Sequence, residues 1–212
     1  MAKNMAKFPR PSLDSALNQL SNHDHSRFLT RTNGTVGTIK TMGAEAAKKN
    51  IDKAVFALGV LLQMTWPGSP GIYYGDEAGQ VGWTDPDNRR TYPWGKEDKR
   101  LILLHKKLTE LRGKTDCLKM GSVKALTYGD GYISYARFNK NDCVIVVINR
   151  NKTDEKFILP VWEAGVKNGA VLSNCFDSSA PEFNCEEQVK VKNGRVTVEV
   201  KAKSGKAFYC KL

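Results

Sequence analysis

The residues best suited to do chemistry are a carboxylate and an imidazole at the end of a short predicted strand. Asn22, His23 and Asp24 follow the segment 16–20 (ALNQL), which has the character of that strand. In α/β proteins, ligands bind at the carboxyl ends of the strands, where catalytic side chains also lie. A carboxylate beside an imidazole can form hydrogen bonds to neighbouring hydroxyls of a polyol. The alternative is structural: Asp24 would cap the turn, and His23 would be a polar group without chemistry.

The same segment raises the question of a metal site. His23 and His25 would share one face if the strand continued through them. The remaining histidine, His105, falls inside a predicted helix, and the sequence contains no further cluster of ligand residues. The HD dipeptide of metal-dependent phosphohydrolases needs an earlier histidine, and none precedes His23. We therefore expect neither a metal nor another cofactor.

Two strand–helix units must position this segment. The first is the strand 16–20 and a helix from Ala44 to Trp66, and the second is a short buried strand at 72–74 and a helix from Glu97 to Lys114. The long helix is expected to bury Val55, Leu58, Leu61, Leu62 and Thr65. This order favours consecutive βα units with parallel strands. Two such units leave apolar sheet edges open, so this part resembles the end of something larger and is expected to self-associate when alone.

After residue 119 the hydrophobic pattern changes to alternation with a period of two. Asn193-Gly194 between alternating runs predicts a hairpin. The pattern predicts antiparallel strands that pack as a β-sandwich. The predicted strands are 123–128, 132–138, 143–149, 156–161, 170–176, 188–192, 196–201 and 207–212.

Composition excludes several classes of protein. With 41% hydrophobic and 26% charged residues among 212, the chain is neither a disordered tail nor a fibre nor a disulfide miniprotein. The net charge of +11 divides into +6 before residue 119 (18 basic, 12 acidic) and +5 after it (15 basic, 10 acidic). A nucleic-acid binder usually concentrates its positive charge in one stripe or module, so this even spread favours a solvated basic surface.

The longest apolar run and the cysteine count bear on location. Residues 54–64 fall well short of the roughly 20 residues that span a bilayer, and 1–7 (MAKNMAK) do not lead into the apolar core of a signal peptide. The five cysteines are an odd number without CxxC spacing, which favours a reducing compartment. We therefore expect a water-soluble, cytoplasmic protein.

Three stretches, taken together, resemble the α-amylase family, glycoside hydrolase family 13. They are 20–28 (LSNHDHSRF), 66–79 (WPGSPGIYYGDEAG) and 82–90 (GWTDPDNRR) followed by 92–94 (YPW). Their order and spacing agree with the family, and the branch that they most resemble is the group of cyclomaltodextrinases, neopullulanases and maltogenic amylases. The resemblance implies that residues 1–118 are the last two βα units of a TIM (β/α)8 barrel and that 119–212 are the following β-sandwich.

The resemblance also implies roles for four residues. Asp24 matches the carboxylate that stabilises the transition state, and His23 matches the neighbouring histidine that binds the same sugar. Asp85 and Arg89 match a pair that holds the next glucose, although a loop salt bridge is the alternative for them. Such a carboxylate suits an oxocarbenium-like transition state, because hydrogen bonds from the ring hydroxyls strengthen there.

Other residues are weaker candidates for the site. Asp76 and Glu77 follow the predicted strand at 72–74, and adjacent residues on a strand point to opposite faces, so their side chains are not expected to converge on one glycosidic oxygen. Large aromatic side chains are usually core, which we expect for Trp66, while Trp83 and Trp94 remain open as platforms for sugar rings.

Two essential groups have no counterpart in these 212 residues. Retaining hydrolysis needs a nucleophilic carboxylate and a general acid about 5–5.5 Å apart. In this family the nucleophile lies in a Gly-x-Arg-x-Asp stretch, which the sequence lacks. The expected function is therefore that of the C-terminal part of a retaining α-glucan hydrolase, inactive alone, whose partners are an α-glucan or maltooligosaccharide and the missing barrel strands. The alternatives are a non-catalytic glucan-binding or assembly module and a catalytically dead relative.

Overall fold

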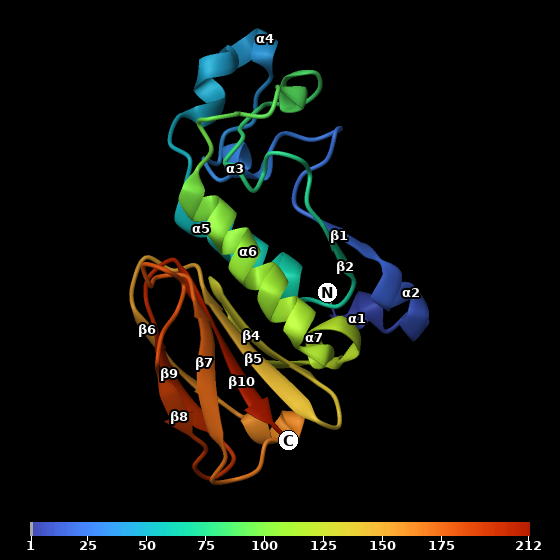
Figure 1. Cartoon of the computed structure of the whole chain (residues 1–212), viewed down its shortest axis with the longest axis vertical. Helices are drawn as coiled ribbons and strands as arrows, with labels where there is room; N and C mark the ends of the chain where they lie inside the picture. The colour runs from blue at the N-terminus through green and yellow to red at the C-terminus, as the bar shows by residue number, and fades with distance from the viewer. Residues whose placement is uncertain (1) are drawn as a thin grey trace.

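A computed structural model describes residues 2–212 of the chain (Figure 1). The α-helices are α1 (Ala2–Met5), α2 (Arg10–Ser15), α3 (Phe28–Arg31), α4 (Ile39–Met42), α5 (Lys53–Thr65), α6 (Lys99–Lys114) and α7 (Asp116–Met120). Short 3₁₀ helices are η1 (Ala44–Lys48), η2 (Asp87–Arg89) and η3 (Val161–Ala164). The strands are β1 (Leu17–Gln19), β2 (Ser69–Gly71), β3 (Ser122–Gly129), β4 (Tyr132–Phe138), β5 (Asp142–Asn149), β6 (Glu155–Leu159), β7 (Val171–Asp177), β8 (Gln188–Lys190), β9 (Val196–Val200) and β10 (Ser204–Lys211). Among residues 2–212, no helix is both long and apolar enough to cross a membrane.

The first two strands, β1 and β2, form a two-stranded parallel sheet, which confirms the predicted orientation. The second strand lies at Ser69–Gly71, and the prediction of a buried strand at 72–74 is wrong. Pro70 lies within this strand, and an edge strand tolerates proline because the missing N–H can face away from the ladder. Gln63 fixes the pairing, since its Nε2 donates to the backbone oxygens of Asn18 (3.0 Å) and Gly71 (2.8 Å).

Helix α5 begins at Lys53, so the prediction of one helix from Ala44 to Trp66 is wrong. The 3₁₀ helix η1 covers the first residues, and Asn50, with φ of 55°, interrupts the chain in the left-handed region. Asp52 then caps α5, since its Oδ1 accepts hydrogen bonds from the amides of Ala54 and Val55, both at 3.0 Å.

Burial around α5 also differs from the prediction. Leu58, Leu61 and Thr65 are buried as expected, but Val55 and Leu62 are half-buried. Residues on the other sides of the helix are buried as well, among them Phe56, Val60 and Met64. The helix is enclosed on most sides because it packs against β1, α6 and the antiparallel sheet together.

The second half of the chain contains all eight predicted strands in two antiparallel sheets. Six of them form one sheet in the order β3-β4-β5-β10-β7-β8, and β6 pairs with β9 in the other. Strand β5 is buried along its whole length, which indicates that both faces of the larger sheet are covered. Residues from both sheets share one apolar cluster, whose members include Ile145, Phe157, Val198 and Phe208.

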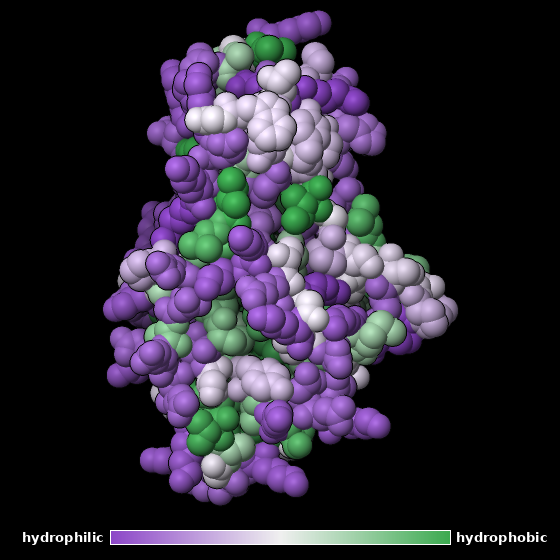
Figure 2. Space-filling model, in the orientation of Figure 1, coloured by the Kyte–Doolittle hydropathy of each residue, from purple (hydrophilic) through white to green (hydrophobic). Residues whose placement is uncertain are grey.

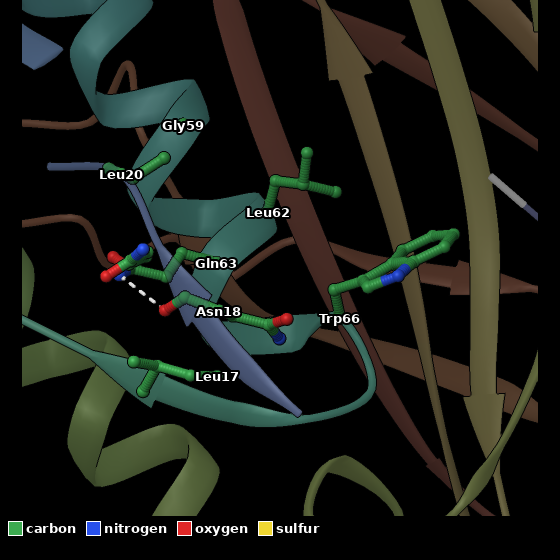
Figure 3. Close-up of a pocket in the computed structure, with 8 residues that line it drawn as sticks. Leu17, Asn18, Leu20, Gly59, Leu62, Gln63 and Trp66 are labelled. Carbon is green, nitrogen blue, oxygen red and sulfur yellow. Dashed lines mark hydrogen bonds between the residues drawn. The ribbon is translucent and has the colours of Figure 1, made fainter. Parts of the chain in front are cut away.

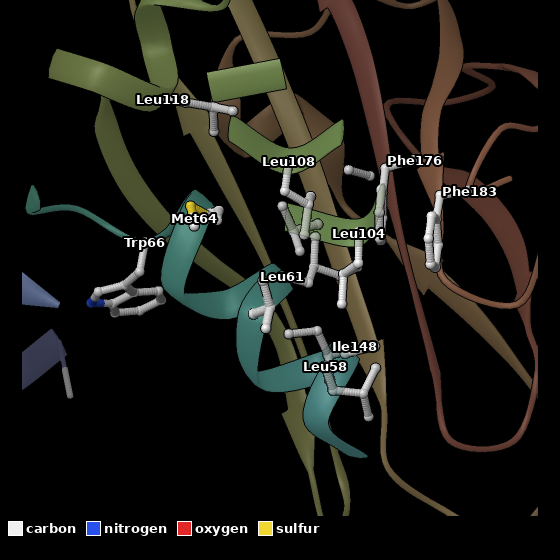
Figure 4. Packing of buried hydrophobic residues seen from close by; sticks show 14 of the residues in the cluster. Leu58, Leu61, Met64, Trp66, Leu104, Leu108, Leu118, Ile148, Phe176 and Phe183 are labelled. Atoms are coloured by element: carbon white, nitrogen blue, oxygen red, sulfur yellow. The ribbon is translucent and has the colours of Figure 1, made fainter. Parts of the chain in front are cut away.

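The opposite face of the larger sheet packs against α5 and α6, as Figures 1 and 4 show. Leu58 and Leu61 from α5 and Leu104 from α6 meet Ile148 and Phe176 from the sheet. One apolar core therefore joins the N-terminal and C-terminal parts of the chain. The approach is close at Gly205, where a Cβ atom would lie 2.7 Å from a methyl carbon of Leu61.

Asp52 joins the same two parts at the helix start. Its Oδ2 lies 2.6 Å from Nζ of Lys203 in the turn before β10. Burial would raise the pKa of Asp52, but the hydrogen bonds from Lys203 and from the helix amides outweigh it and hold the pKa below its ordinary value. This stabilisation is therefore present above the unfolded-state pKa and is lost as the pH falls through the lowered folded-state pKa.

Replacing Asp52 by alanine is expected to lower the free energy of unfolding by about 1 kcal/mol, because the cap of α5 is lost. Asp52→Asn should cost less, since an asparagine oxygen can still cap the helix. Urea unfolding at neutral pH measures both variants. If Asp52→Asn proves as costly as Asp52→Ala, the ion pair with Lys203 and not the cap carries the stabilisation.

Candidate functional site

The loop after β1 holds His23 and Asp24 on the surface. Asn22 caps this turn, since its Oδ1 accepts hydrogen bonds from the amides of Asp24 (3.0 Å) and His25 (3.1 Å). The alternative prediction that Asp24 caps the turn is therefore wrong. Nε2 of His23 lies 3.2 Å from Oδ1 of Asp24, and the two side chains are 60% and 66% exposed. This carboxylate is open to a ligand.

The loop after β2 carries the second predicted pair, Asp85 and Arg89, beside the loop that holds His23 and Asp24. Nε of Arg89 donates to Oδ1 of Asp85, and the two side chains are 49% and 55% exposed. The hydrogen bond that Arg89 donates to Asp85 is the main cause that raises the pKa of Arg89, and Coulomb interactions with Asp85, Tyr73 and Asp24 raise it further. The two loops meet through Asn88, the neighbour of Arg89 in the chain, whose Nδ2 donates to the backbone oxygens of His23 and His25, both at 2.8 Å. The ion pair itself also fits the alternative of a loop salt bridge.

Tyr73, which the sequence analysis did not single out, lies between the two loops. It follows β2 and lines a shallow hollow of about 190 Å³ together with Ser21, Asn22 and His23. Its ring also stacks on the guanidinium of Arg27, whose Cζ lies 4.0 Å from the ring centroid.

A buried ion pair lies beneath the exposed residues. Nη1 of Arg27 is 3.0 Å from Oδ1 of Asp76, and the two side chains are 0% and 5% exposed. The same Nη1 donates to the backbone oxygen of Tyr74 at 2.6 Å. Burial raises the pKa of Asp76, and hydrogen bonds from Ser21 and Arg27 together with the charge of Arg27 partly oppose that shift. Asp76 is therefore a structural carboxylate under the site. Asp76 and Glu77 lie in a turn after β2, so the strand alternation from which their side chains were predicted to diverge is absent there.

Asn88 is a further buried polar residue under the loops. It is fully buried, and its Nδ2 donates to the backbone oxygens of Asn22 (3.3 Å), His23 (2.8 Å) and His25 (2.8 Å). The sequence analysis missed both Asn88 and Arg27 as parts of the site. A charged residue directly before the apolar pair Phe28-Leu29 was the available signal for Arg27, whereas no pattern marked Asn88.

The three tryptophans of the N-terminal part, among the four of the chain, differ in exposure. Trp66 is core, as predicted, with 8% exposure. Trp83 is 1% exposed, and its Nε1 donates to the backbone oxygen of Gly43, so it cannot stack on a sugar. Trp94 is 80% exposed and lies against Tyr92, with ring centroids 4.5 Å apart. Only Trp94 of the three remains a candidate platform for a sugar ring.

The structure gives no support for a metal centre at His23 and His25. Within the described part of the chain, no three His, Cys, Asp or Glu side chains lie together in a way that could hold a metal ion. The chemistry available at the surface is therefore that of carboxylates, an imidazole, a guanidinium and aromatic rings.

Comparisons with known proteins show what the whole chain is similar to. The family model "Alpha amylase, catalytic domain" matches residues 2–194. An amylopullulanase of Thermoanaerobacter thermohydrosulfuricus is 33% identical over 210 residues, which cover 94% of this chain and 13% of that protein. A cyclomaltodextrinase of a Bacillus species is 33% identical over 156 residues, covering 72% of this chain and 25% of that protein. The crystal structure of an Anoxybacillus α-amylase has the same fold over 99% of this chain and 40% of that one, with a TM-score of 0.77 and 24% identity.

Proposed function

The chain belongs to the α-amylase family of glycoside hydrolases, and on that premise we propose that it forms the C-terminal part of a retaining α-glucan hydrolase. In this proposal residues 1–118 are the last two βα units of a (β/α)8 barrel, and residues 119–212 are a β-sandwich. The chain spans 13% and 25% of the length of the two relatives described above. The activity therefore belongs to an assembly larger than these 212 residues.

The observation that carries the proposal is the convergence of four polar side chains at one end of the parallel strands. Asp24 and His23 follow β1, Asp85 and Arg89 lie in the loop after β2, and hydrogen bonds from Asn88 to the backbone around Asp24 join the two loops. Asp24 would accept hydrogen bonds from ring hydroxyls, which strengthen as the sugar acquires oxocarbenium character. His23 would bind the same sugar, and Asp85 with Arg89 would hold its neighbour.

Unpaired strand edges support a polypeptide partner that supplies the other barrel strands. Within residues 2–212, β1 and β2 pair only with each other, so each leaves one edge open. Beside β1 a hollow of about 260 Å³ is lined by Leu17, Leu20, Gly59 and Leu62, and Figure 3 shows these residues. Leu17 is 63% exposed. A strand and helix preceding β1 would cover this apolar surface.

The rest of the visible surface offers less for a partner. On the face shown in Figure 2, hydrophobic residues appear as small separate groups among hydrophilic ones. A second copy of the chain at the open edges is the alternative partner. The cytoplasmic location stays a prediction. All five cysteines are free, which is consistent with it.

The test is a calorimetric titration of the chain with maltoheptaose. We expect weak binding that Asp24→Asn and Asp85→Asn both reduce by about tenfold, because each removes a charged hydrogen-bond acceptor from the sugar. Asp154→Asn is the matched control, since Asp154 is a similarly exposed carboxylate paired with Lys201 in the sheet region. If the two site variants bind like the wild type, the site assignment fails. If Trp162→Ala, at an exposed tryptophan of η3, abolishes binding instead, the alternative of a glucan-binding module built on the sheets is favoured.

A further inference from the structure

We infer that Asn88 is a positioning residue that fixes the loop 22–25 and thereby sets the place of the Asp24 carboxylate. This inference rests on the proposed function of Asp24. It concerns a residue that touches no substrate, because its side chain is completely buried beneath the two loops.

The contacts of the Asn88 side chain carry the inference. A side-chain amide has two N–H hydrogens, and here they serve three backbone oxygens, those of Asn22, His23 and His25. These residues flank Asp24 on both sides. Among the described residues, the one hydrogen-bond or ion-pair partner of the Asp24 carboxylate is Nε2 of His23 at 3.2 Å, and both side chains are exposed. The position of the carboxylate therefore depends on the backbone that Asn88 holds.

Arg27 holds Asn88 in turn. Nε of Arg27 donates to the backbone oxygen of Asn88 at 2.8 Å, and the backbone amide of Arg27 donates to the backbone oxygen of Gly82 at 2.9 Å. The amide of Gly82 donates to Oγ1 of Thr30 at 2.9 Å. A Cβ atom on Gly82 would lie 2.5 Å from the backbone oxygen of Asp87, so the backbones of the two residues are in contact. The loops that carry Asp24 and the Asp85–Arg89 pair are thus one hydrogen-bonded unit.

Position 88 needs a donor. The three hydrogen-bond partners of the Asn88 side chain are carbonyl oxygens, all bound by Nδ2, while its Oδ1 is buried without a partner. A buried carbonyl without a partner is costly. A hydroxyl in place of the amide would supply one hydrogen and a shorter reach. The carbonyls would then turn toward water, and the turn that carries Asp24 would move with them.

The chain contains a matched control at Asn149. It is also fully buried, and its Nδ2 also donates to three backbone oxygens, those of Thr153, Val200 and Lys201. It lies at the end of β5, in the sheet region. Asn88→Ser and Asn149→Ser therefore remove the same kind of Nδ2 donor from two places, of which only one adjoins the site. Asn149 differs in that its Oδ1 also accepts a hydrogen bond from the amide of Asn151 at 3.0 Å.

The experiment measures amide hydrogen exchange and maltoheptaose affinity for the full chain carrying either substitution. In Asn88→Ser we expect exchange at the amides of Asp24 and His25 to quicken by about tenfold, and the dissociation constant to rise by a similar factor, since more than one hydrogen bond is lost. In Asn149→Ser both quantities should match the wild type, while exchange quickens near residues 150–154. Equal exchange at Asp24 and His25 in the two variants would overturn the inference, as would unchanged affinity in Asn88→Ser when exchange has quickened.

Two further measurements keep the result decisive. If Asn88→Ser does not fold, the side-chain amide of Asn88 in the wild type is observed directly by NMR. Slow exchange of both of its hydrogens supports the inference, and fast exchange contradicts it. If the wild type does not bind maltoheptaose while exchange follows the expected pattern, the proposed function fails and the control of the loop by Asn88 stands.

Discussion

Replacing Arg27 by methionine is expected to lower the free energy of unfolding by about 3–5 kcal/mol, because removing one partner of a buried ion pair leaves the other charge uncompensated. Arg27 is completely buried, and Asp76 would lose both a charge partner and a hydrogen bond. The backbone oxygens of Asn88 and Tyr74 would lose their donors as well. Urea unfolding at pH 7 measures the loss.

The pH dependence identifies the cause of this loss. Burial already holds the folded-state pKa of Asp76 above its ordinary value, and loss of Arg27 should raise it further. A carboxyl whose folded-state pKa is raised destabilises the native state as the pH rises from the unfolded-state pKa through the folded-state one. The difference between wild type and Arg27→Met should therefore be smaller at pH 4 than at pH 7.

Two control variants complete the test. The double variant Arg27→Met/Asp76→Leu should recover much of the stability, because no unpaired charge remains buried. Arg100→Met should cost little, since Arg100 is exposed and donates only to carbonyls of the loop at 178–181. A double variant as unstable as Arg27→Met alone would show that the hydrogen bonds to carbonyls, and not the ion pair, stabilise this region.

The second large effect concerns catalysis. The chain alone is expected to leave maltoheptaose intact, because neither a Gly-x-Arg-x-Asp stretch nor the acid that follows it is present in these residues. Mixed with a polypeptide that carries the first six βα units of a cyclomaltodextrinase, it should release shorter oligosaccharides. Asp24→Asn should then lower kcat by about 10³-fold, because it removes a charge aimed at the transition state. Chromatography of the products measures both.

Asp154→Asn again provides the control and should leave the reconstituted activity unchanged. Cleavage by the pure chain, abolished by Asp24→Asn, would show that the catalytic groups lie within these 212 residues and would contradict the proposal. A mixed assembly that forms but stays inactive with wild-type chain would point to the catalytically dead relative instead.

Local patterns predicted much of this fold. The hydrophobic pattern after residue 119 located every strand of the two antiparallel sheets. Burial alternates along β6 and β9, as a period of two predicts, whereas β5 is buried on both faces. The helix at Lys99–Lys114 was predicted within two residues of its start. The prediction failed at the start of α5, because it included the segment 44–52 in the helix. There Asn50 in the left-handed region and the Asp52 cap decide the boundary.

The sequence by itself determined which residues are candidates for sugar chemistry, since Asp24, His23, Asp85 and Arg89 stand in motifs of adjacent residues. Only the tertiary structure decided that these motifs meet, that Trp83 is core, and that Arg27, Asp76 and Asn88 form the buried support beneath them. The physical reason is distance along the chain. Asn88 finds its acceptors more than 60 positions away, and no spacing rule of a helix or a strand extends that far.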